Sequence, residues 1–140
     1  MIMISSKGRY ALRVMTYLAV NADREFVPLK EIAEAESISL KYLESIARML
    51  SKEHYIEGTS GRGGGYHLTR KPEAYKVGDI LRLTEGTLAP VSCLKDNAEP
   101  CGRAELCCTL PVWQGVSNVI TDYLDNMTLA DVAGKGRFGE

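Results

Sequence analysis

Apolar residues recur at helical spacing near the start of the chain. Ala11, Val14 and Leu18 lie three and four residues apart, with Met15 beside them, and this spacing predicts an amphipathic helix over about residues 6–21. The polar residues that follow, 21–26, indicate a loop. The first predicted element is therefore a surface helix with its apolar side on a core.

Two shorter helices are predicted next, separated by a few residues. Pro28 suits the first turn of one helix, with Leu29, Ile32 and Ala33 on its inner side, and Ser39 can cap the other. The capped helix has apolar inner positions (Leu43, Ile46, Ala47 and Leu50) and a polar, partly basic outer face (Lys41, Tyr42, Glu44, Ser45 and Arg48). Such a pair fits a helix-turn-helix, whose second helix enters the major groove of DNA.

A glycine-rich hairpin is predicted directly after this pair. Residues 55–60 and 65–69 read as two short strands around a GRGG turn. Gly63 and Gly64 permit positive φ and clear side chains from the tip, so Arg62 can project toward a narrow minor groove. A plain surface hairpin is the alternative. The pattern of a phosphate-binding nucleotide loop, G-x-x-x-x-G-K-[ST], does not occur here.

The second half of the chain predicts two more helices, over residues 77–86 and, starting at Pro111, over 111–133. The apolar stripe of the longer helix is wider than one small domain needs. We therefore expect it to pack partly on its own domain and partly on a second copy; a purely internal helix is the alternative. Its stripe consists of Trp113, Val116, Ile120, Tyr123 and Met127.

Composition sets the class of protein. The 140 residues carry a net charge of −1, with 45% hydrophobic residues, as in a typical globular domain. Lys and Arg exceed Asp and Glu by 11 to 8 over residues 1–71, which would suit a mild preference for anions there. Neither a membrane span nor a signal peptide is predicted, so we expect a cytoplasmic protein with reduced thiols. The sequence contains no catalytic constellation, which disfavours a metalloenzyme or electron carrier.

All four cysteines lie in one polar segment, residues 92–110. Thiolates are soft ligands that suit iron–sulfur clusters, zinc or copper(I). Zinc is the rival metal, but structural zinc sites prefer paired C-x(2–4)-C knuckles, which this spacing does not provide. A metal-free thiol sensor is the other alternative. Cys108 directly follows Cys107 and has three roles open: a fourth ligand, a spare thiol or a small buried residue.

The segments SKGRYALRVMTYLA, LKEIAEAESISLKYLESIARML, GRGGGYHL, VGDILRLTEG and VWQGVSNVITDYLDNMTLADV together resemble the Rrf2 family of bacterial winged-helix transcription regulators, over about residues 4–133. The resemblance is to its IscR-like members, which are related to the NsrR and CymR types. It implies a homodimer that binds double-stranded DNA, usually a palindromic operator. It also implies that the DNA-facing start of the recognition helix carries Ser39, Lys41, Tyr42 and Glu44. It also implies a [2Fe–2S] or [4Fe–4S] cluster on Cys93, Cys101 and Cys107.

Two departures from the family pattern concern the site. Ser60 stands where members often place a wing arginine, and Arg62 is the available substitute. Leu110 stands where IscR-like members have a histidine ligand, and Arg9 where NsrR-type members supply an aspartate. The fourth cluster ligand is therefore open.

The expected fold is mainly α-helical with a small β-hairpin wing. Its expected divisions are a winged helix-turn-helix domain (1–88), a cysteine-rich cluster-binding loop (89–110), a dimerisation helix (111–133) and a flexible tail (134–140). The expected function is that of a repressor whose DNA binding responds to redox state, iron or nitric oxide through the cluster.

Overall fold

The computed structural model describes residues 4–95 and 104–135. Three helices come first, followed by a two-stranded antiparallel hairpin and then by three more helices, with short 3-10 turns between them. The helices and strands are α1 (Ser6–Val20), α2 (Leu29–Glu36), α3 (Leu40–Lys52), β1 (Ile56–Thr59), β2 (Gly65–Leu68), α4 (Val77–Glu85), α5 (Leu110–Asp125) and α6 (Leu129–Lys135). The prediction of a mainly helical fold with a small hairpin is confirmed.

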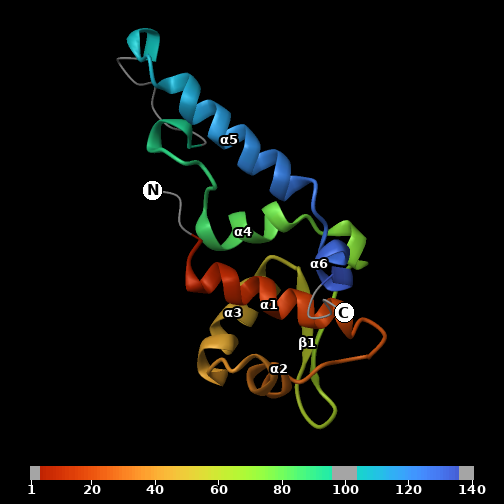
Figure 1. Ribbon diagram of the computed structural model, residues 1–140. Helices are drawn as coiled ribbons and strands as arrows, with labels where there is room; N and C mark the ends of the chain where they lie inside the picture. The colour runs from red at the N-terminus through yellow and green to blue at the C-terminus, as the bar shows by residue number, and fades with distance from the viewer. Residues whose placement is uncertain (1–3, 96–103, 136–140) are drawn as a thin grey trace.

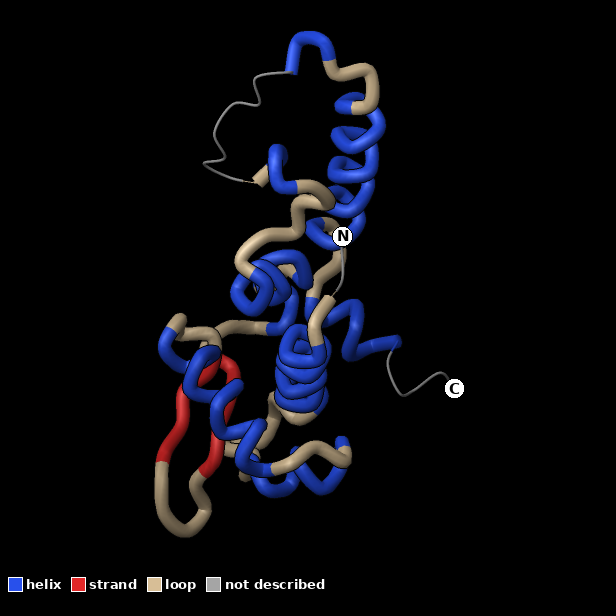
Figure 2. The backbone as a smooth tube through the Cα atoms, turned by 90° about the vertical axis from the view of Figure 1, so that its left-hand side faces the viewer, coloured by secondary structure: helices blue, strands red, loops and turns tan. Residues whose placement is uncertain are grey.

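The elements form successive layers along the length of the molecule, although not in chain order. Figure 1 shows α2, α3 and the hairpin at one end, α1 and α4 in the middle, and α5 at the opposite end. Figure 2 shows the same order after a quarter turn, with the hairpin and α5 pointing away from each other. The hairpin tip and the 3-10 turn just before α5 (Ala104–Leu106) are therefore the two extremities of the described fold.

The main core surrounds α1. Its inner side, Ala11, Val14, Met15 and Leu18, is buried as the apolar spacing predicts, and it packs on buried residues of α2, α3 and β1. Burying a side chain of this size contributes ~1.5–3 kcal/mol, so these contacts hold the three helices together. The core residues of those elements are Ile32, Ala33, Leu43, Ile46, Ala47, Leu50 and Ile56.

A helix-turn-helix is formed by α2 and α3. Ser39 caps α3, its side chain accepting a hydrogen bond from the Tyr42 amide at 3.1 Å, which confirms the predicted cap. The turn closes through Ser37, which adopts a left-handed conformation (φ 56°), and the Ile38 amide donates to the carbonyl of Ala33. This turn sets the direction in which α3 leaves α2.

The hairpin pairs Ile56 with Leu68 and Thr59 with Gly65, so its strands are slightly shorter than predicted. Tyr66 also exchanges two backbone hydrogen bonds of 2.9 Å with Val27, which precedes α2. This isolated bridge ties the hairpin to the segment just before α2.

A second, smaller core joins α4 to the C-terminal helices. Val77, Leu81 and Leu88 are buried there, and Ile120, Leu124 and Met127 pack against them. Arg82 of α4 adds a bidentate ion pair to Asp125 at the end of α5, with two N–O distances of 2.8 Å. One end of α5 is thus anchored on the winged-helix domain.

The single helix predicted over residues 111–133 is wrong, because the chain forms two helices there. α5 ends at Asp125, and α6 begins after a break at residues 126–128. Thr128 and Asp131 cap α6 reciprocally: the Thr128 amide donates to the Asp131 carboxylate at 2.9 Å, and the Asp131 amide donates to the Thr128 hydroxyl at 3.1 Å. The predicted tail of residues 134–140 lies mostly outside the described residues.

Across the described ranges, 4–95 and 104–135, the helices include none with the length and apolar character that a membrane span requires.

Candidate nucleic-acid interface and cysteine segment

The outer face of α3 carries most of the residues predicted to contact DNA. Ser39, Lys41, Glu44 and Arg48 are exposed, whereas Ser45 is half-buried and donates a hydrogen bond to the Tyr42 carbonyl at 2.8 Å. Ser39 is also engaged as the helix cap. The outer face of α3 therefore presents a mixed polar surface, on which Lys41 and Arg48 form no ion pair with any residue that the structure describes.

Tyr42 lies closer to the core than its place in the sequence pattern indicates. Its ring meets the ring of Tyr10 edge to face, with centroids 5.6 Å apart. The guanidinium groups of Arg9 and Arg13 lie 6.0 and 5.5 Å from the Tyr10 centroid. Sequence reasoning missed Tyr10 as a neighbour of α3, because only the packing of α1 on α3 brings the two tyrosines together.

The hairpin tip has the geometry that its glycines predict. Gly63 has φ 80°, which non-glycine residues rarely adopt. Gly64 is needed for another reason: a Cβ at this position would meet the carbonyl oxygen of Thr59. Arg62 and Ser60 are exposed on the same turn, at the free end of the hairpin.

Tyr75 holds the base of the hairpin. Only 1% of this residue is exposed. Its hydroxyl donates to the Tyr55 carbonyl at 2.7 Å and accepts from the amides of Thr69 and Arg70 at 3.1 Å. The backbone carbonyl of Tyr75 accepts from the amide of Leu129, the first residue of α6. One residue therefore connects both strand ends to the C-terminal helices.

The cysteine segment is described in two pieces. Cys93 lies exposed in a 3-10 turn (Ser92–Leu94), and Cys107 and Cys108 lie in the turn before α5. Cys101 falls outside the described residues. Within residues 4–95 and 104–135 no three Cys, His, Asp or Glu side chains converge as a metal site.

Cys107 differs from the other two described thiols in its surroundings. Its sulfur lies 3.4 Å from the hydroxyl of Thr109. Hydrogen bonding to this hydroxyl, and then to the backbone at the start of α5, lowers the pKa of the Cys107 thiol. A thiolate is the form that binds metal, so the donor chemistry at this position fits an iron–sulfur cluster. Leu110, the first residue of α5, supplies no ligand.

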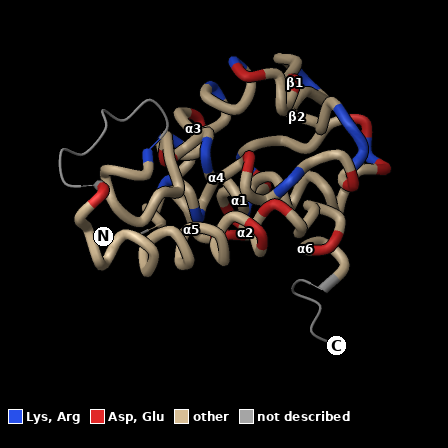
Figure 3. The backbone as a smooth tube through the Cα atoms, turned by 90° about the horizontal axis from the view of Figure 1, so that it is seen from above, with Lys and Arg blue, Asp and Glu red and all other residues tan. Residues whose placement is uncertain are grey.

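α5 has no buried residue although it is rich in apolar side chains. Residues 110–121 carry no charge, and Figure 3 shows the tube of α5 almost entirely in the colour of uncharged residues. Ile120 and Met127, two of the five predicted stripe residues, pack on the second core. Trp113, Val116 and Tyr123 are exposed by 38%, 37% and 64%, beside Val119 at 69%. The stripe thus has an internal part that packs on the second core (Ile120 and Met127) and an exposed part, here called the bare half of α5 (Trp113, Val116, Val119 and Tyr123).

These elements define the class of protein. A helix-turn-helix followed by a two-stranded wing, on a domain built around α1, is the winged-helix fold of transcription regulators. The model of the Rrf2 family, described as "Iron-dependent Transcriptional regulator", matches residues 4–135, and the chain belongs to this family. The predicted resemblance is thereby confirmed.

Individual relatives agree with this assignment. Protein rrf2 of Nitratidesulfovibrio vulgaris is 36% identical over 129 residues, which cover 92% of this chain and 85% of the relative. CymR, the global cysteine regulator of B. subtilis, has a structure with a TM-score of 0.82 and 33% identity, covering 97% of this chain and 99% of CymR. IscR of T. potens has a TM-score of 0.77 and 32% identity, covering 99% and 90%.

Proposed function

We propose that this protein is a homodimeric, sequence-specific DNA-binding repressor of the cytoplasm, not an enzyme, whose DNA binding responds to an iron–sulfur cluster. The observation that carries the proposal is the separation of two surfaces. The polar face of α3 and the hairpin lie at one end of the molecule, and a bare apolar helix lies at the other (Figure 1). A palindromic operator would meet two copies of the first surface.

The contacts to double-stranded DNA are assigned by the chemistry of each side chain. Lys41 and Arg48 would bind phosphates or guanine, and the Glu44 carboxylate would accept from cytosine N4 in the major groove. Ser39, Tyr42 and Ser45 would set the position of the helix on the backbone. The wing residues Arg62, Gly63 and Gly64 would approach the adjacent minor groove, with Arg62 as the inserted cation.

The bare half of the α5 stripe is the proposed dimer interface. Val116, Val119 and Tyr123 are exposed on one side of the helix, and Trp113 and Val112 extend that side toward its start. A monomer would leave this apolar surface in water, which costs ~25 cal/mol for each Å². Ile120 and Met127, assigned in the sequence to the dimer interface, would support it from the internal side.

The cluster is proposed on Cys93, Cys101 and Cys107, as [2Fe–2S] or [4Fe–4S], with Cys108 as a possible fourth ligand. The lowered pKa of Cys107 supports this assignment. When bound, the cluster would supply a centre that changes with redox state, iron supply or nitric oxide.

The chain's own residues offer a route from the cysteines to the DNA-binding elements. Cys107 lies three residues before the first residue of α5, and Asp125 at the other end of α5 is paired with Arg82. A shift in the position of Cys107 would therefore move the start of α5 relative to α4. In a dimer that motion changes the spacing of the two α3 helices, which shifts the population that matches the operator.

Anaerobic purification followed by visible absorption and iron analysis tests the cluster. The expected result is a coloured protein that contains iron and sulfide. Colourless protein that resists reconstitution would overturn the cluster and leave DNA binding as a separate question. Zinc in stoichiometric amount would indicate a zinc-stabilised regulator instead.

A cluster-free regulator of cysteine or sulfur metabolism is the second candidate. It is favoured by the TM-score of 0.82 to CymR. Under this candidate the purified protein contains no metal, and its affinity for the operator changes with a thiol metabolite or with thiol oxidation.

Gel shifts in rising salt test the DNA-binding function. An operator selected from a random duplex pool should bind far more tightly than a mixed-sequence duplex, and both affinities should fall steeply with salt. Failure to bind either duplex, with and without metal, would overturn the proposed function.

A further inference from the structure

Two arginines of α1 belong to neither the proposed α3 and wing contacts nor the proposed dimer interface. Arg9 and Arg13 are one helical turn apart on α1, and both are exposed. Among the residues that the structure describes, neither forms an ion pair within 4.0 Å, although Arg9 donates a hydrogen bond to the Ser6 hydroxyl at 3.2 Å. Two like charges at this spacing destabilise an isolated helix by ~0.2–0.5 kcal/mol, and an external anion would relieve the repulsion.

Both guanidinium groups lie near the ring of Tyr10. Arg13 and Arg9 lie 5.5 and 6.0 Å from its ring centroid, on a ring that is itself packed edge-on against Tyr42. One cation over the ring would already supply the stabilising cation–π contact. A second cation beside the first adds repulsion, so packing of α1 alone does not account for the pair.

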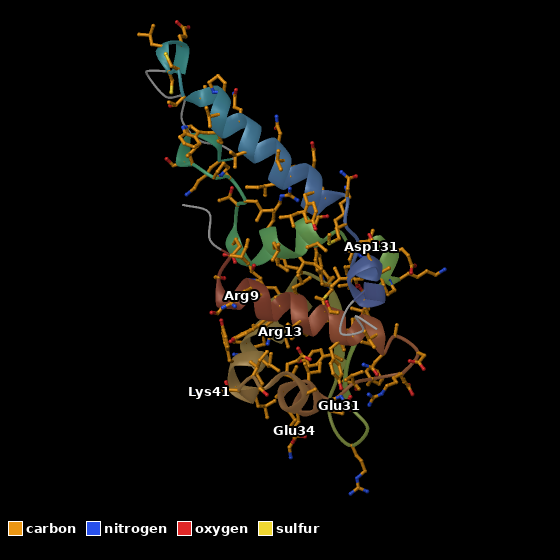
Figure 4. All side chains as sticks on the ribbon, in the orientation of Figure 1. Arg9, Arg13, Glu31, Glu34, Lys41 and Asp131 are labelled. Atoms are coloured by element: carbon orange, nitrogen blue, oxygen red, sulfur yellow. The ribbon has the colours of Figure 1, made fainter. Side chains whose placement is uncertain are left out.

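The same tyrosine contact joins these arginines to the start of α3. Tyr42 is in the first turn of α3, directly after Lys41. Figure 4 shows Arg9 and Lys41 toward the same edge of the molecule, with Arg13 farther along α1. The N-terminus of α3, a helix of 13 residues, adds a partial positive charge beside Lys41. We call Arg9, Arg13 and Lys41 the α1 basic patch.

The acidic residues near the patch leave its charge largely uncompensated. Glu31 is engaged by Arg24 and Tyr17, at 2.6 to 2.9 Å. Glu36, at the end of α2, lines the same groove as Arg9 and Arg13 but forms no ion pair with them within the described part of the chain. Glu44 is on the exposed face of α3. The patch therefore offers three cationic groups around the end of a helix.

We propose that the α1 basic patch contacts the phosphates that flank the major-groove site of α3, so that α1 extends the DNA footprint beyond the helix-turn-helix and the wing. Arginine suits this partner because its planar guanidinium pairs with phosphate oxygens. The inference rests on the proposed DNA-binding function. Phosphate contacts carry no base preference, so the patch contributes affinity and salt dependence without sequence discrimination.

The test compares Arg13→Ala, Arg9→Ala and Arg13→Lys with the wild type. Dissociation constants are measured over a salt series for a selected operator and for a mixed-sequence duplex of equal length. Each alanine variant removes one phosphate contact per protomer, so in a dimer the slope of log K against log salt should become less negative by about 2. Arg13→Lys should keep the wild-type slope. The ratio of operator to mixed-sequence affinity should stay the same in all three.

Lys76→Ala is the matched control. This variant removes the same charge, but Lys76 lies at the start of α4, where its backbone forms an isolated β-bridge with Thr128. Its salt slope should equal that of the wild type. Alanine variants of Arg9 and Arg13 with wild-type slopes would overturn the inference while the proposed function stands. Dissociation of the dimer in those variants, seen by sedimentation, would overturn it too, because the arginines would then serve assembly. Wild-type protein that binds neither duplex would overturn the proposed function itself.

Discussion

Glu31 shows how one side chain secures the helix-turn-helix to the rest of the domain. Its carboxylate accepts hydrogen bonds from both guanidinium nitrogens of Arg24, in the loop after α1, and from the hydroxyl of Tyr17 in α1. The hydrogen bonds from Arg24, which has the larger effect, and from Tyr17 lower the pKa of Glu31 from 4.5 to about 2. The first turn of α2 is thereby tied to α1.

Glu31→Gln should lower stability in a pH-dependent way. Because the folded-state pKa of Glu31 is depressed, its contribution is present above the unfolded pKa of 4.5 and is lost as the pH falls toward 2. The pair is partly exposed, so we expect a fall in melting temperature of only roughly 2–4 °C at pH 7. Thermal unfolding from pH 7 to pH 3 checks this. A difference between wild type and variant that persists undiminished at pH 3 would contradict the assignment.

Alanine variants of Cys101, Cys107 and Cys108 should differ in their effect on iron content. Cys101→Ala and Cys107→Ala should each abolish the cluster, because each removes a proposed ligand. Cys108→Ala should retain it, since Cys108 is exposed and its sulfur lies 3.9 Å from the Leu106 carbonyl, without another described partner. Visible absorption and iron analysis of anaerobic preparations provide the measurement. Loss of the cluster in Cys108→Ala would identify this residue as the missing fourth ligand.

At the residue scale, the sequence predicts local chemistry better than distant contacts. The Ser39 cap follows from residue type and position, because a cap acts within its own helix turn. The half-burial of Tyr42 could not be predicted, because it depends on Tyr10, which lies 32 positions away in the chain and meets Tyr42 only through helix packing.

At the scale of elements, the joint between α4 and α5 fixes the direction of the exposed helix. Arg82 pairs with both oxygens of Asp125, and the pair raises the pKa of Arg82 and lowers that of Asp125. Gly78 lies one turn before Arg82, and a Cβ there would meet the Asp125 carboxylate. The close approach and the ion pair together set the angle between the two helices.

Arg82→Ala and Gly78→Ala should therefore have similar effects. The first removes the pair, and the second displaces Asp125 from it, at a cost of about 1 kcal/mol for this partly exposed pair. We expect a fall of roughly 2–4 °C in melting temperature and weaker operator binding. Calorimetry and gel shifts measure the two effects. Asp79→Ala removes only the exposed 3.2 Å contact to Arg82 and serves as the control with near wild-type behaviour.

The break between α5 and α6 shows where the apolar pattern misleads. Ile120, Leu124 and Met127 continue at helical spacing up to the break, so periodicity alone extends the helix through it. The competing signal was present in the sequence as Thr128-x-x-Asp131, a capping box. The chain follows the cap because the break also lets the Val77 amide donate to the Met127 carbonyl and the Leu129 amide donate to the Tyr75 carbonyl.

At the scale of the whole molecule, the bare half of α5 predicts an effect on assembly. Val119→Asp would place a charge in the proposed dimer interface, where burying it unpaired is costly. We expect the dimer dissociation constant to rise by about tenfold or more, and binding to a palindromic duplex to fall with it. Sedimentation velocity and gel shifts are the measurements.

Asn118→Asp adds the same charge to a side of α5 that bears no apolar stripe. It should leave the dimer intact. Equal dissociation in both variants would point to a general charge effect, and monomeric wild-type protein would contradict the proposed interface.

The overall architecture was largely predictable because each helix has its own period and start signal. The relation of the two cores was not. It depends on side chains such as Arg82 and Glu85, which reach Asp125 and Ser5 across the fold. Similarly, the spacing of the cysteines indicates a ligand set, but the chain path around Cys101 lies outside the described residues.

The absence of any buried side chain in α5 has a thermodynamic consequence. In the proposed dimer, the packing that orders this helix comes from association, so mass action makes its stability depend on how much protein the cell contains. Low copy number would favour single subunits, each able to meet only half of a two-fold site. In the proposed dimer, the concentration of the protein would then act as a second input beside the cysteine segment.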